Sequence, residues 1–420
     1  MTRARVYAIG FIAAACAFAG KPACAQTLGE AIATAYATNP RLAAARARQE
    51  AQAEAPVQAR AVGRPTLAIN GDASHEDGAS GAASASVTLA VPIWTGGRVS
   101  SAVRAAQGDV AAGAETLRDV EADILQSVVV AYAALLYHQQ AVEIARVGIE
   151  RLDQQVAEAR SRYELGQATR TDLAQLEAQR AAVIANLADA EGALAIAAED
   201  YNAAVGQQAG SLTPEVPPPA LLPGSLAEAR DQAKLNNPQL LRQRHIAEAS
   251  SARVDQARAE RAPSADIVSR YGGGRRYGSD AGGAFDDDAS IGVTFRVPLF
   301  SGGLVTSRIK EARAMHLADQ YEADAAERAV VRAAGAAWAS LANAEARLNA
   351  STEGLSAADL ALRGVRAEYG FGLRSTTDVL VADQTYRMAQ LAVAAAQTDV
   401  IIAQAGLLRA AGKLGRDAYS

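Results

Sequence analysis

The chain has 420 residues, of which 21% are charged and 5% are aromatic, and its formal net charge is -5. This acidic balance argues against a nucleic-acid partner, because nucleic-acid binding depends on basic side chains that contact phosphates. Abundant alanine and scarce aromatic residues favour long, closely packed helices over bulky globular cores.

The N-terminus has the pattern of a secretory signal peptide over residues 1–25. Basic residues precede an apolar stretch that ends at Ala19, and Ala23-Cys24-Ala25 supplies the small residues before a cleavage site. Both cysteines of the chain fall in this segment, so the mature protein, expected to begin at Gln26, has no disulfide and no thiol nucleophile. Lipid attachment at Cys24 stays open. No later stretch is expected to cross a membrane as a helix.

The mature chain reads as two repeats, 26–205 and 225–420, joined by a linker at 206–224 that is rich in proline and glycine. Three motifs of the first repeat recur in the second. The first, Thr27-Leu28-Gly29-Glu30-Ala31, recurs as Ser225-Leu226-Ala227-Glu228-Ala229. The second, Val91-Pro92-Ile93-Trp94-Thr95-Gly96-Gly97, recurs as Val297-Pro298-Leu299-Phe300-Ser301-Gly302-Gly303. The third, Tyr163-Glu164-Leu165-Gly166, recurs as Tyr369-Gly370-Phe371-Gly372.

Each repeat is expected to begin with two helices. Thr27 and Ser225 are each followed three residues later by glutamate, which is the spacing of a capping box. Pro40 and Pro238 suit the first turn of the second helix, where a missing N–H costs nothing.

A β-hairpin follows in each repeat, at about 66–93 and about 265–300. The alternation is clearest at Ile291, Val293, Phe295 and Val297, whose neighbours are glycine, threonine or arginine. The segment Gly272-Gly273-Gly274-Arg275-Arg276 is interpreted as part of an outer loop, and the acidic run Asp286-Asp287-Asp288 as a solvated loop.

Long helical hairpins are expected at about 98–205 and 303–414, where prolines are absent from the helical tracts. A helix from about Arg98 to Glu164 would be about 100 Å long. Apolar residues recur in steps of four and three along it, which is the pattern of a coiled-coil seam, and only His138 interrupts the stripe. We interpret His138 as a polar residue that sets specificity within the seam.

Four strands cannot close a barrel, and a lipid bilayer does not tolerate an open sheet edge. Strands that span a membrane would therefore be shared between copies, and three copies would supply twelve strands, an even number within the range of outer-membrane barrels. The alternative is a periplasmic coiled-coil structural protein whose strands form an ordinary soluble sheet and which has no channel activity.

The duplicated layout, the Val-Pro-(Leu/Ile)-(Phe/Trp)-(Ser/Thr)-Gly-Gly motif and the turn between the long helices resemble the TolC outer-membrane efflux family. The resemblance covers essentially the whole mature chain. It implies a fold that is mainly α with a small β part: a homotrimer with a shared twelve-stranded barrel in outer-membrane lipid and an α-barrel in the periplasm. It also implies a passive exit for efflux or type I secretion that docks a periplasmic adaptor and an inner-membrane pump.

The resemblance also implies roles for residues at the helix-hairpin turns. Two groups of positions match the family. The first implies a periplasmic gate at Asp172, Arg374 and Asp378. The second implies an adaptor-docking tip at Leu165, Gly166, Thr169, Phe371, Gly372 and Ser375. The family's second aspartate ring falls at Val381, with Asp383 nearby. Simpler roles stay open, since the two gate aspartates would also stabilise helix N-termini and the glycines would also permit a tight turn.

No set of residues suggests catalysis or a bound cofactor. The four histidines are scattered along the chain without a second ligand at helical spacing, so no metal site is expected. The sequence therefore indicates a transport or structural protein and not an enzyme, and it does not reveal the cargo.

Overall fold

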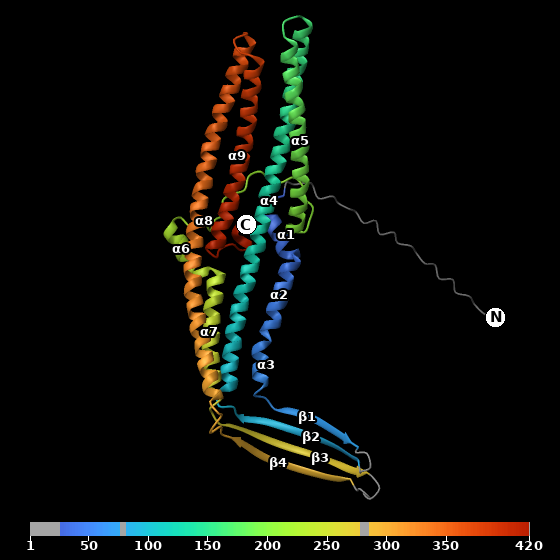
Figure 1. Ribbon diagram of the computed structural model, residues 1–420, viewed down its shortest axis with the longest axis vertical. Coiled ribbons are helices and arrows are strands. Elements are labelled where there is room, and N and C mark those ends of the chain that lie inside the picture. Colours follow the sequence, from blue (N-terminus) through green and yellow to red (C-terminus); the bar gives the residue numbers. More distant parts are fainter. Residues whose placement is uncertain (1–25, 76–80, 278–284, 420) are drawn as a thin grey trace, which may run out of the picture.

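The computed structural model describes residues 26–75, 81–277 and 285–419. The expected signal peptide at 1–25 lies outside this part of the chain. The protein is mostly helical with one small antiparallel sheet. Figure 1 shows that the sheet lies at one end of a long molecule and the turns of two helical hairpins at the other.

The first half of the chain contains three short helices, two strands and two long helices. They are α1 (Leu28–Thr38), α2 (Pro40–Ala53), α3 (Ala55–Ala61), β1 (Thr66–Ser74), β2 (Gly81–Trp94), α4 (Arg98–Glu164) and α5 (Arg170–Val205). The expected helix from Arg98 to Glu164 is therefore confirmed.

The second half follows a similar order and ends in a short 3₁₀ helix. Its elements are α6 (Leu226–Asn236), α7 (Pro238–Ala259), β3 (Ser264–Tyr277), β4 (Asp286–Arg296), α8 (Leu304–Gly370), α9 (Thr376–Ala410) and η1 (Arg416–Tyr419). The long helices α4 and α8 each have 67 residues, which corresponds to about 100 Å.

The helix starts agree with the sequence, with one difference in detail. Thr27 and Glu30 form a complete capping box, and Pro40 and Pro238 occupy the first turns of α2 and α7. The hydroxyl of Ser225 accepts a hydrogen bond from the backbone N–H of Glu228. The side-chain carboxylate of Glu228, however, accepts from the N–H of Gly224 and not from that of Ser225.

The sheet has the order β1-β2-β3-β4, with all neighbours antiparallel. Because directly paired residues share a face, the register separates two faces of opposite character. One face is mostly apolar, apart from Ser269, Arg275 and Asp287, and the other is mostly polar. The apolar face includes Leu67, Ile69, Val87, Leu89, Val91, Ile267, Tyr271, Ile291, Val293 and Phe295, and the polar face includes Asn70, Asp72, Ser84, Ser86, Thr88, Asp266, Arg270, Asp288, Thr294 and Arg296.

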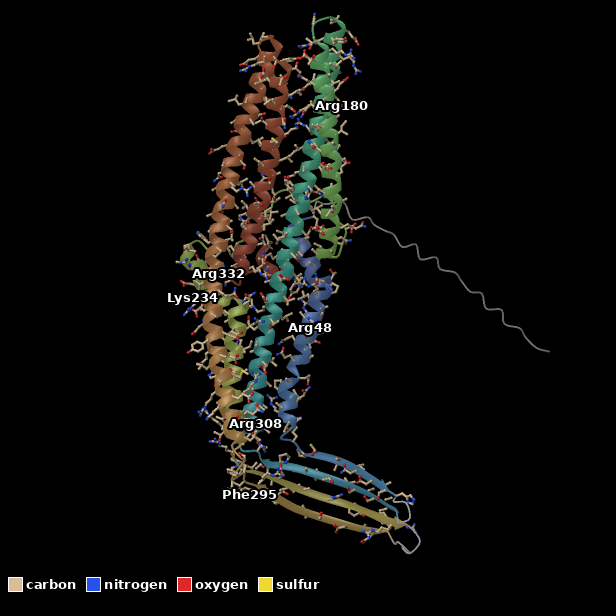
Figure 2. All side chains as sticks on the ribbon, viewed as in Figure 1. Arg48, Arg180, Lys234, Phe295, Arg308 and Arg332 are labelled. Carbon is tan, nitrogen blue, oxygen red and sulfur yellow. The ribbon has the colours of Figure 1, made fainter. Side chains whose placement is uncertain are left out.

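The apolar face is exposed in the isolated chain, where Ile69 and Ile291 are each 79% exposed. A contiguous apolar surface of this kind is typical of a protein or membrane contact. Figure 2 shows Phe295 on the sheet, near the helical end.

Two loop assignments from the sequence are wrong. The segment Gly272-Gly273-Gly274-Arg275-Arg276 continues strand β3, and the acidic run Asp286-Asp287-Asp288 begins β4. The glycines allow close pairing with β2, since a Cβ atom at Gly272 would lie 2.5 Å from the Cβ of Ser86. Conversely, Val297 lies beyond the end of β4, so the alternating strand ends earlier than expected.

Glycine pairs turn the chain from the sheet into the long helices. Gly97 and Gly303 are the N-cap residues of α4 and α8, with φ values of 86° and 85°. This left-handed backbone conformation favours glycine, which explains the Gly-Gly ending of each strand motif.

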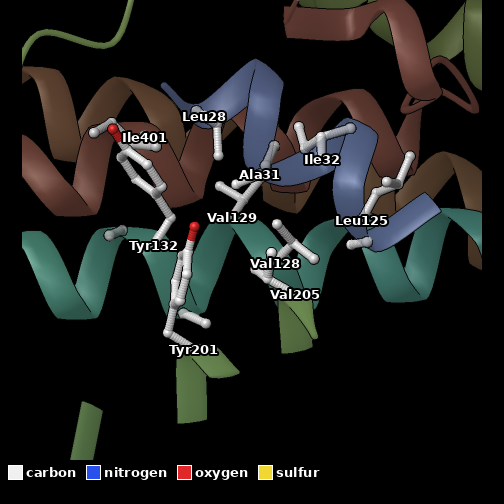
Figure 3. Packing of buried hydrophobic residues seen from close by; sticks show 14 of the residues in the cluster. Leu28, Ala31, Ile32, Leu125, Val128, Val129, Tyr132, Tyr201, Val205 and Ile401 are labelled. Atoms are coloured by element: carbon white, nitrogen blue, oxygen red, sulfur yellow. The ribbon is translucent and has the colours of Figure 1, made fainter. Parts of the chain in front are cut away.

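The expected coiled-coil seam lies inward along α4 and α8. Buried positions include Ile124, Val128, Leu135 and Leu152 on α4, and Ala334 on α8 is fully buried. The largest core cluster packs α1 against the middle of α4, with contributions from α5 and α9 (Figure 3). This core holds the two hairpins together halfway along the molecule.

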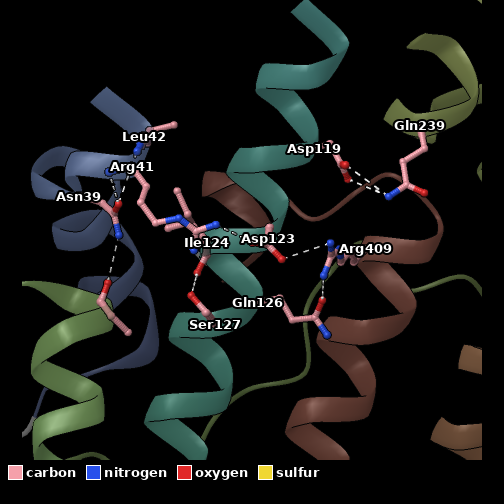
Figure 4. A network of polar contacts seen from close by, with 11 residues as sticks. Asn39, Arg41, Leu42, Asp119, Asp123, Ile124, Gln126, Ser127, Gln239 and Arg409 are labelled. Carbon is pink, nitrogen blue, oxygen red and sulfur yellow. Dashed lines mark hydrogen bonds and ion pairs between the residues drawn. The ribbon is translucent and has the colours of Figure 1, made fainter. Parts of the chain in front are cut away.

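Polar contacts join the C-terminal part of α9 to α4 near this core (Figure 4). Asp123 pairs with Arg409 at 3.3 Å and with Arg41 at 3.4 Å, and Arg409 also donates to Gln126. One carboxylate on α4 therefore connects α2 and α9.

No run of 18 uninterrupted apolar residues follows the expected signal peptide, so a membrane-crossing helix is not expected, but length and mean hydropathy alone would allow a helix to cross a membrane. Three helices, α4, α5 and α9, are long and apolar enough to do so. In α5 the most apolar stretch is only 11% buried in the isolated chain. Alanine explains the difference, because it raises the mean hydropathy without producing the unbroken run of large apolar residues that the sequence reading required.

Candidate functional site

The two hairpin turns lie side by side at the end of the molecule opposite the sheet (Figure 1). The first joins α4 to α5 across residues 165–169, and the second joins α8 to α9 across residues 371–375. Arg180, labelled in Figure 2, lies on the outer part of the first hairpin. Every residue that the sequence assigned to a gate or a docking tip belongs to these turns or to the first turn of α5 or α9.

The first turn presents an apolar side chain to solvent. Leu165 is 72% exposed, and Gly166 has a φ of 72° that closes the turn through a hydrogen bond from its N–H to the carbonyl of Tyr163. No heavy atom lies within 4 Å of a Cβ placed on Gly166, so the glycine is required by its backbone conformation and not by space.

The second turn has the same construction with larger side chains. Phe371 is 83% exposed and Leu373 is 74% exposed, and Gly372 has a φ of 77°. The N–H of Gly372 donates to the carbonyl of Tyr369 at 3.0 Å. Two tips of one design therefore display apolar groups at the far end of the hairpins.

Each tip ends in a complete capping box at the start of the return helix. The hydroxyl of Thr169 accepts from the N–H of Asp172, and the Asp172 carboxylate accepts from the N–H of Thr169. Ser375 and Asp378 repeat the arrangement, with an N–H to carboxylate distance of 2.9 Å. The aspartates therefore act as helix caps in the isolated chain.

The capping bonds lower the pKa of both aspartates. For Asp172 the main cause is the hydrogen bond from the Thr169 side chain, and for Asp378 it is the bond from the Ser375 backbone. Because the folded tip stabilises the ionised carboxylates, both carry a negative charge at neutral pH.

Arg374 contacts its own hairpin. Its Nε atom donates to Glu368 at 2.6 Å, and this carboxylate, with a smaller contribution from Asp378, raises the pKa of the arginine. Within one chain the structure therefore brings Arg374 close to Asp378 but pairs it with Glu368, and Asp172 is held by Thr169 on the other hairpin.

Two contacts that the sequence did not indicate join the hairpins near the tips. The hydroxyl of Thr377 on α9 donates to Gln175 on α5 at 3.2 Å, and the Arg162 guanidinium lies 5.4 Å from the ring centre of Tyr369. Such cation–π contacts contribute about 0.5–1 kcal/mol at exposed sites.

A buried ionic cluster lies deeper between the hairpins. The Asp383 carboxylate is 1% exposed and pairs with Arg366 at 3.1 Å and with Arg387 at 3.0 Å. Arg387 packs against Gly148 on α4, since a Cβ placed on Gly148 would lie 3.0 Å from the Cδ of Arg387. The spacing Val379, Asp383, Arg387 follows one inward face of α9 and would have revealed the cluster if the seam had been traced through that helix.

The burial of Asp383 affects the expected second ring of charge. Val381, at the position where the resemblance implies a second aspartate ring, is 58% exposed, whereas Asp383 is buried. Asp383 therefore does not replace a missing exposed aspartate in the isolated chain.

The chain was compared with known proteins. The family model described as outer membrane efflux protein matches residues 31–207 and 229–413. The outer membrane efflux protein BepC of Brucella suis biovar 1 is 30% identical over 405 residues, which cover 95% of this chain and 88% of BepC. The outer membrane protein TolC of Escherichia coli is 24% identical over 419 residues, covering 93% of this chain and 83% of TolC.

A solved structure has the same fold. The outer membrane protein VceC from Vibrio cholerae matches with a TM-score of 0.75 at 21% identity, and the match covers 92% of this chain and 96% of VceC.

Proposed function

Because the chain belongs to the outer membrane efflux protein family, we propose that it is the outer-membrane duct of a tripartite efflux or type I secretion system. Its location is the outer membrane, and it is not an enzyme. The observation that carries the proposal is the sheet, which exposes one apolar face at one end of helices about 100 Å long.

The sheet supports a shared barrel. Its outer strands β1 and β4 each have one edge that no other described strand pairs. Each unpaired backbone N–H or C=O group in lipid costs roughly several kcal/mol of free energy. The free edge of β4 would therefore pair with β1 of the next copy. A homotrimer would then form a twelve-stranded barrel, with the apolar face toward lipid and the polar face toward the channel.

The helical hairpins would form an α-barrel in the periplasm. The repeats at 26–205 and 225–420, joined by the linker at 206–224, would supply two hairpins per copy. Residues 1–25 would be removed as a signal peptide on export, which places the sheet and the helices outside the inner membrane.

The tips would dock a periplasmic adaptor that is bound to an inner-membrane pump. The exposed apolar groups of Leu165 and Phe371 support this role, because exposed apolar side chains on a rigid turn are typical of a protein contact. Gly166, Thr169, Gly372 and Ser375 would fix the shape of this surface.

Asp172, Arg374 and Asp378 would form the periplasmic gate. In one chain Arg374 is bound to Glu368, so a bridge from Arg374 to an aspartate of another hairpin would require exchange of that partner. The Arg374–Glu368 pair is exposed, and exposed ion pairs contribute only about 0–1 kcal/mol, so this exchange would cost little.

A conductance measurement separates the duct from the periplasmic structural alternative. We expect the purified protein to require detergent and to produce single-channel conductance in planar bilayers. A monodisperse monomer that stays in solution without detergent and gives no conductance would contradict the duct.

Adaptor recovery tests the docking role. Gly372→Trp would place a large side chain on the tip, where the φ of 77° already disfavours it. We expect the adaptor to co-purify with the wild type and with Gly210→Trp, a control in the exposed linker, but not with Gly372→Trp. Equal recovery with all three proteins would exclude docking at this tip.

A further inference from the structure

Arg387 of α9 lies directly against the backbone of α4 at Gly148. A Cβ atom placed on Gly148 would lie 3.0 Å from the Cδ of Arg387, 3.4 Å from its Nη1 and 3.7 Å from its Nε. Glycine is unfavourable in a helix interior, because it loses more backbone freedom on folding than any other residue. At this buried position of α4, the space left by the missing side chain is occupied by Arg387.

Arg387 cannot move away from Gly148 without breaking other contacts. Its Nε lies 3.0 Å from the Asp383 carboxylate, and the same carboxylate pairs with Arg366 of α8 at 3.1 Å. The Arg387 side chain is only 11% exposed, and separating a buried ion pair leaves uncompensated charges in the interior. The side chain that contacts Gly148 is therefore held in place by both helices of the second hairpin.

The preceding residue of α9 contacts α4 one turn nearer the tip. The guanidinium of Arg151 lies 5.5 Å from the ring centre of Tyr386. Gly148 and Arg151 lie on one face of α4, because residues three apart are neighbours on a helix surface. Two consecutive residues of α9 thus fix how that helix lies against α4, roughly 24 Å before α4 ends at Glu164.

We propose that Gly148 and Arg387 position the periplasmic gate by setting the distance between the two hairpins. This inference rests on the proposed function as a duct whose gate lies at the hairpin tips. Carbon atoms in contact are normally about 3.5–4.0 Å apart. A side chain at position 148 would therefore push Arg387 and its hairpin away from α4, and the continuous helices would carry this displacement to the tips. The glycine thus keeps the hairpins together.

Distances between spin labels on the two tips test this role without requiring conduction. Both cysteines of the chain lie in the expected signal peptide, so Gln167→Cys and Leu373→Cys would label the exposed turns selectively. Dilution with unlabelled chains ensures that both labels of a measured pair belong to one chain. Gly148→Leu should lengthen the mean distance by about 2 Å or more, and Gly148→Ala should lengthen it less. Gly192→Leu in α5, where an added Cβ meets nothing within 4 Å, should leave it unchanged.

Single-channel conductance in planar bilayers measures the gate itself. We expect Gly148→Leu to have a higher conductance than both the wild type and Gly192→Leu. In an Arg387→Ala background, Gly148→Leu should produce no such increase, because the side chain that leucine displaces is absent. A general weakening of the fold would not depend on Arg387 in this way.

An unchanged tip distance in Gly148→Leu, or a longer distance with unchanged conductance, would overturn the proposal. If circular dichroism shows that Gly148→Leu is unfolded, Gly148→Ala takes its place, because alanine favours the helix and adds the smallest side chain. A tip distance that responds to Gly148 in a protein that never conducts, wild type included, would contradict the duct but not the contact between the hairpins.

Discussion

Asp383 and Arg387 lie one turn apart on α9 and form an ion pair at 3.0 Å that is almost completely removed from solvent. Their side chains are 1% and 11% exposed, and Arg366 adds a second contact to the same carboxylate. This cluster connects the two helices of the second hairpin and packs against Gly148 of the first.

Asp383→Asn is expected to destabilise the protein by about 3–5 kcal/mol, because it leaves two arginines without their buried carboxylate. The free energy of unfolding in denaturant measures this loss. Asp359→Asn, which breaks the exposed pair with Arg363, should cost about 0–1 kcal/mol. Similar losses in the two variants would show that burial of the Asp383 cluster has no energetic consequence.

Gly372→Ala is expected to destabilise the second tip by about 1–2 kcal/mol, because a Cβ is unfavourable at a φ of 77°. Hydrogen exchange of the tip peptides measures the effect. Gly354→Ala is the matched control within α8, where a Cβ meets nothing within 4 Å. That change should stabilise the helix by about 1 kcal/mol, so the two replacements should have opposite signs.

The tip should lose order in acid. The pKa of Asp378 is lowered from an ordinary value of 3.8 by hydrogen bonds from Ser375. The stabilisation is therefore complete above the ordinary pKa and disappears as the pH falls through the lower pKa of the folded state. Hydrogen exchange of this tip, corrected for intrinsic rates, should rise below about pH 4 in the wild type. A rise of the same size in Asp378→Asn would assign the effect to another group.

High pH should destabilise the core near Tyr132. Burial raises the pKa of Tyr132 from 10.0 to about 12, and its hydroxyl lies 2.9 Å from the carbonyl oxygen of Thr213. Its contribution to stability is thus complete below the ordinary pKa and is lost as the pH rises through the folded value. Tyr132→Phe should reduce the fall in melting temperature between neutral pH and pH 11. An unchanged fall would exclude Tyr132 as a source.

The two faces of the sheet should differ in their tolerance of charge. Val293→Arg places a cation on the apolar face and should destabilise the protein in lipid, by up to about 2–4 kcal/mol, which is the cost at the bilayer midplane. Thr294→Arg changes the neighbouring residue on the polar face and should have little effect. The measurement is unfolding in lipid vesicles, and equal losses would argue against a lipid-facing Val293.

The helices and their caps were predictable because their causes are local. An apolar stripe at steps of three and four, together with the absence of proline, sets the extent of α4, and Thr27 or Pro40 marks a helix start within a few residues. Similar reasoning underestimated β3, because its three consecutive glycines have low strand propensity. They pair there because β2 presents small residues such as Ser86 opposite Gly272.

The tip residues were assigned through the resemblance of a repeated turn motif to the family, but their partners could not be assigned in this way. The bond from Arg374 to Glu368 depends on the path of the turn, which the spacing of residues does not define. The cluster at Asp383 was missed for a different reason. A charged residue in a helix is usually solvated, and the second partner of Asp383, Arg366, lies on α8, which meets α9 only in the folded chain.

The unbroken course of α4 makes the first hairpin a long arm that extends from the central core. From Tyr132 in the central core to Glu164 at the tip, the helix extends for roughly 48 Å at about 1.5 Å per residue. A tilt of about 5° at the core would therefore move the tip by roughly 4 Å. Small changes in packing around the middle of the molecule would thus be amplified into displacements of several ångströms at the tip.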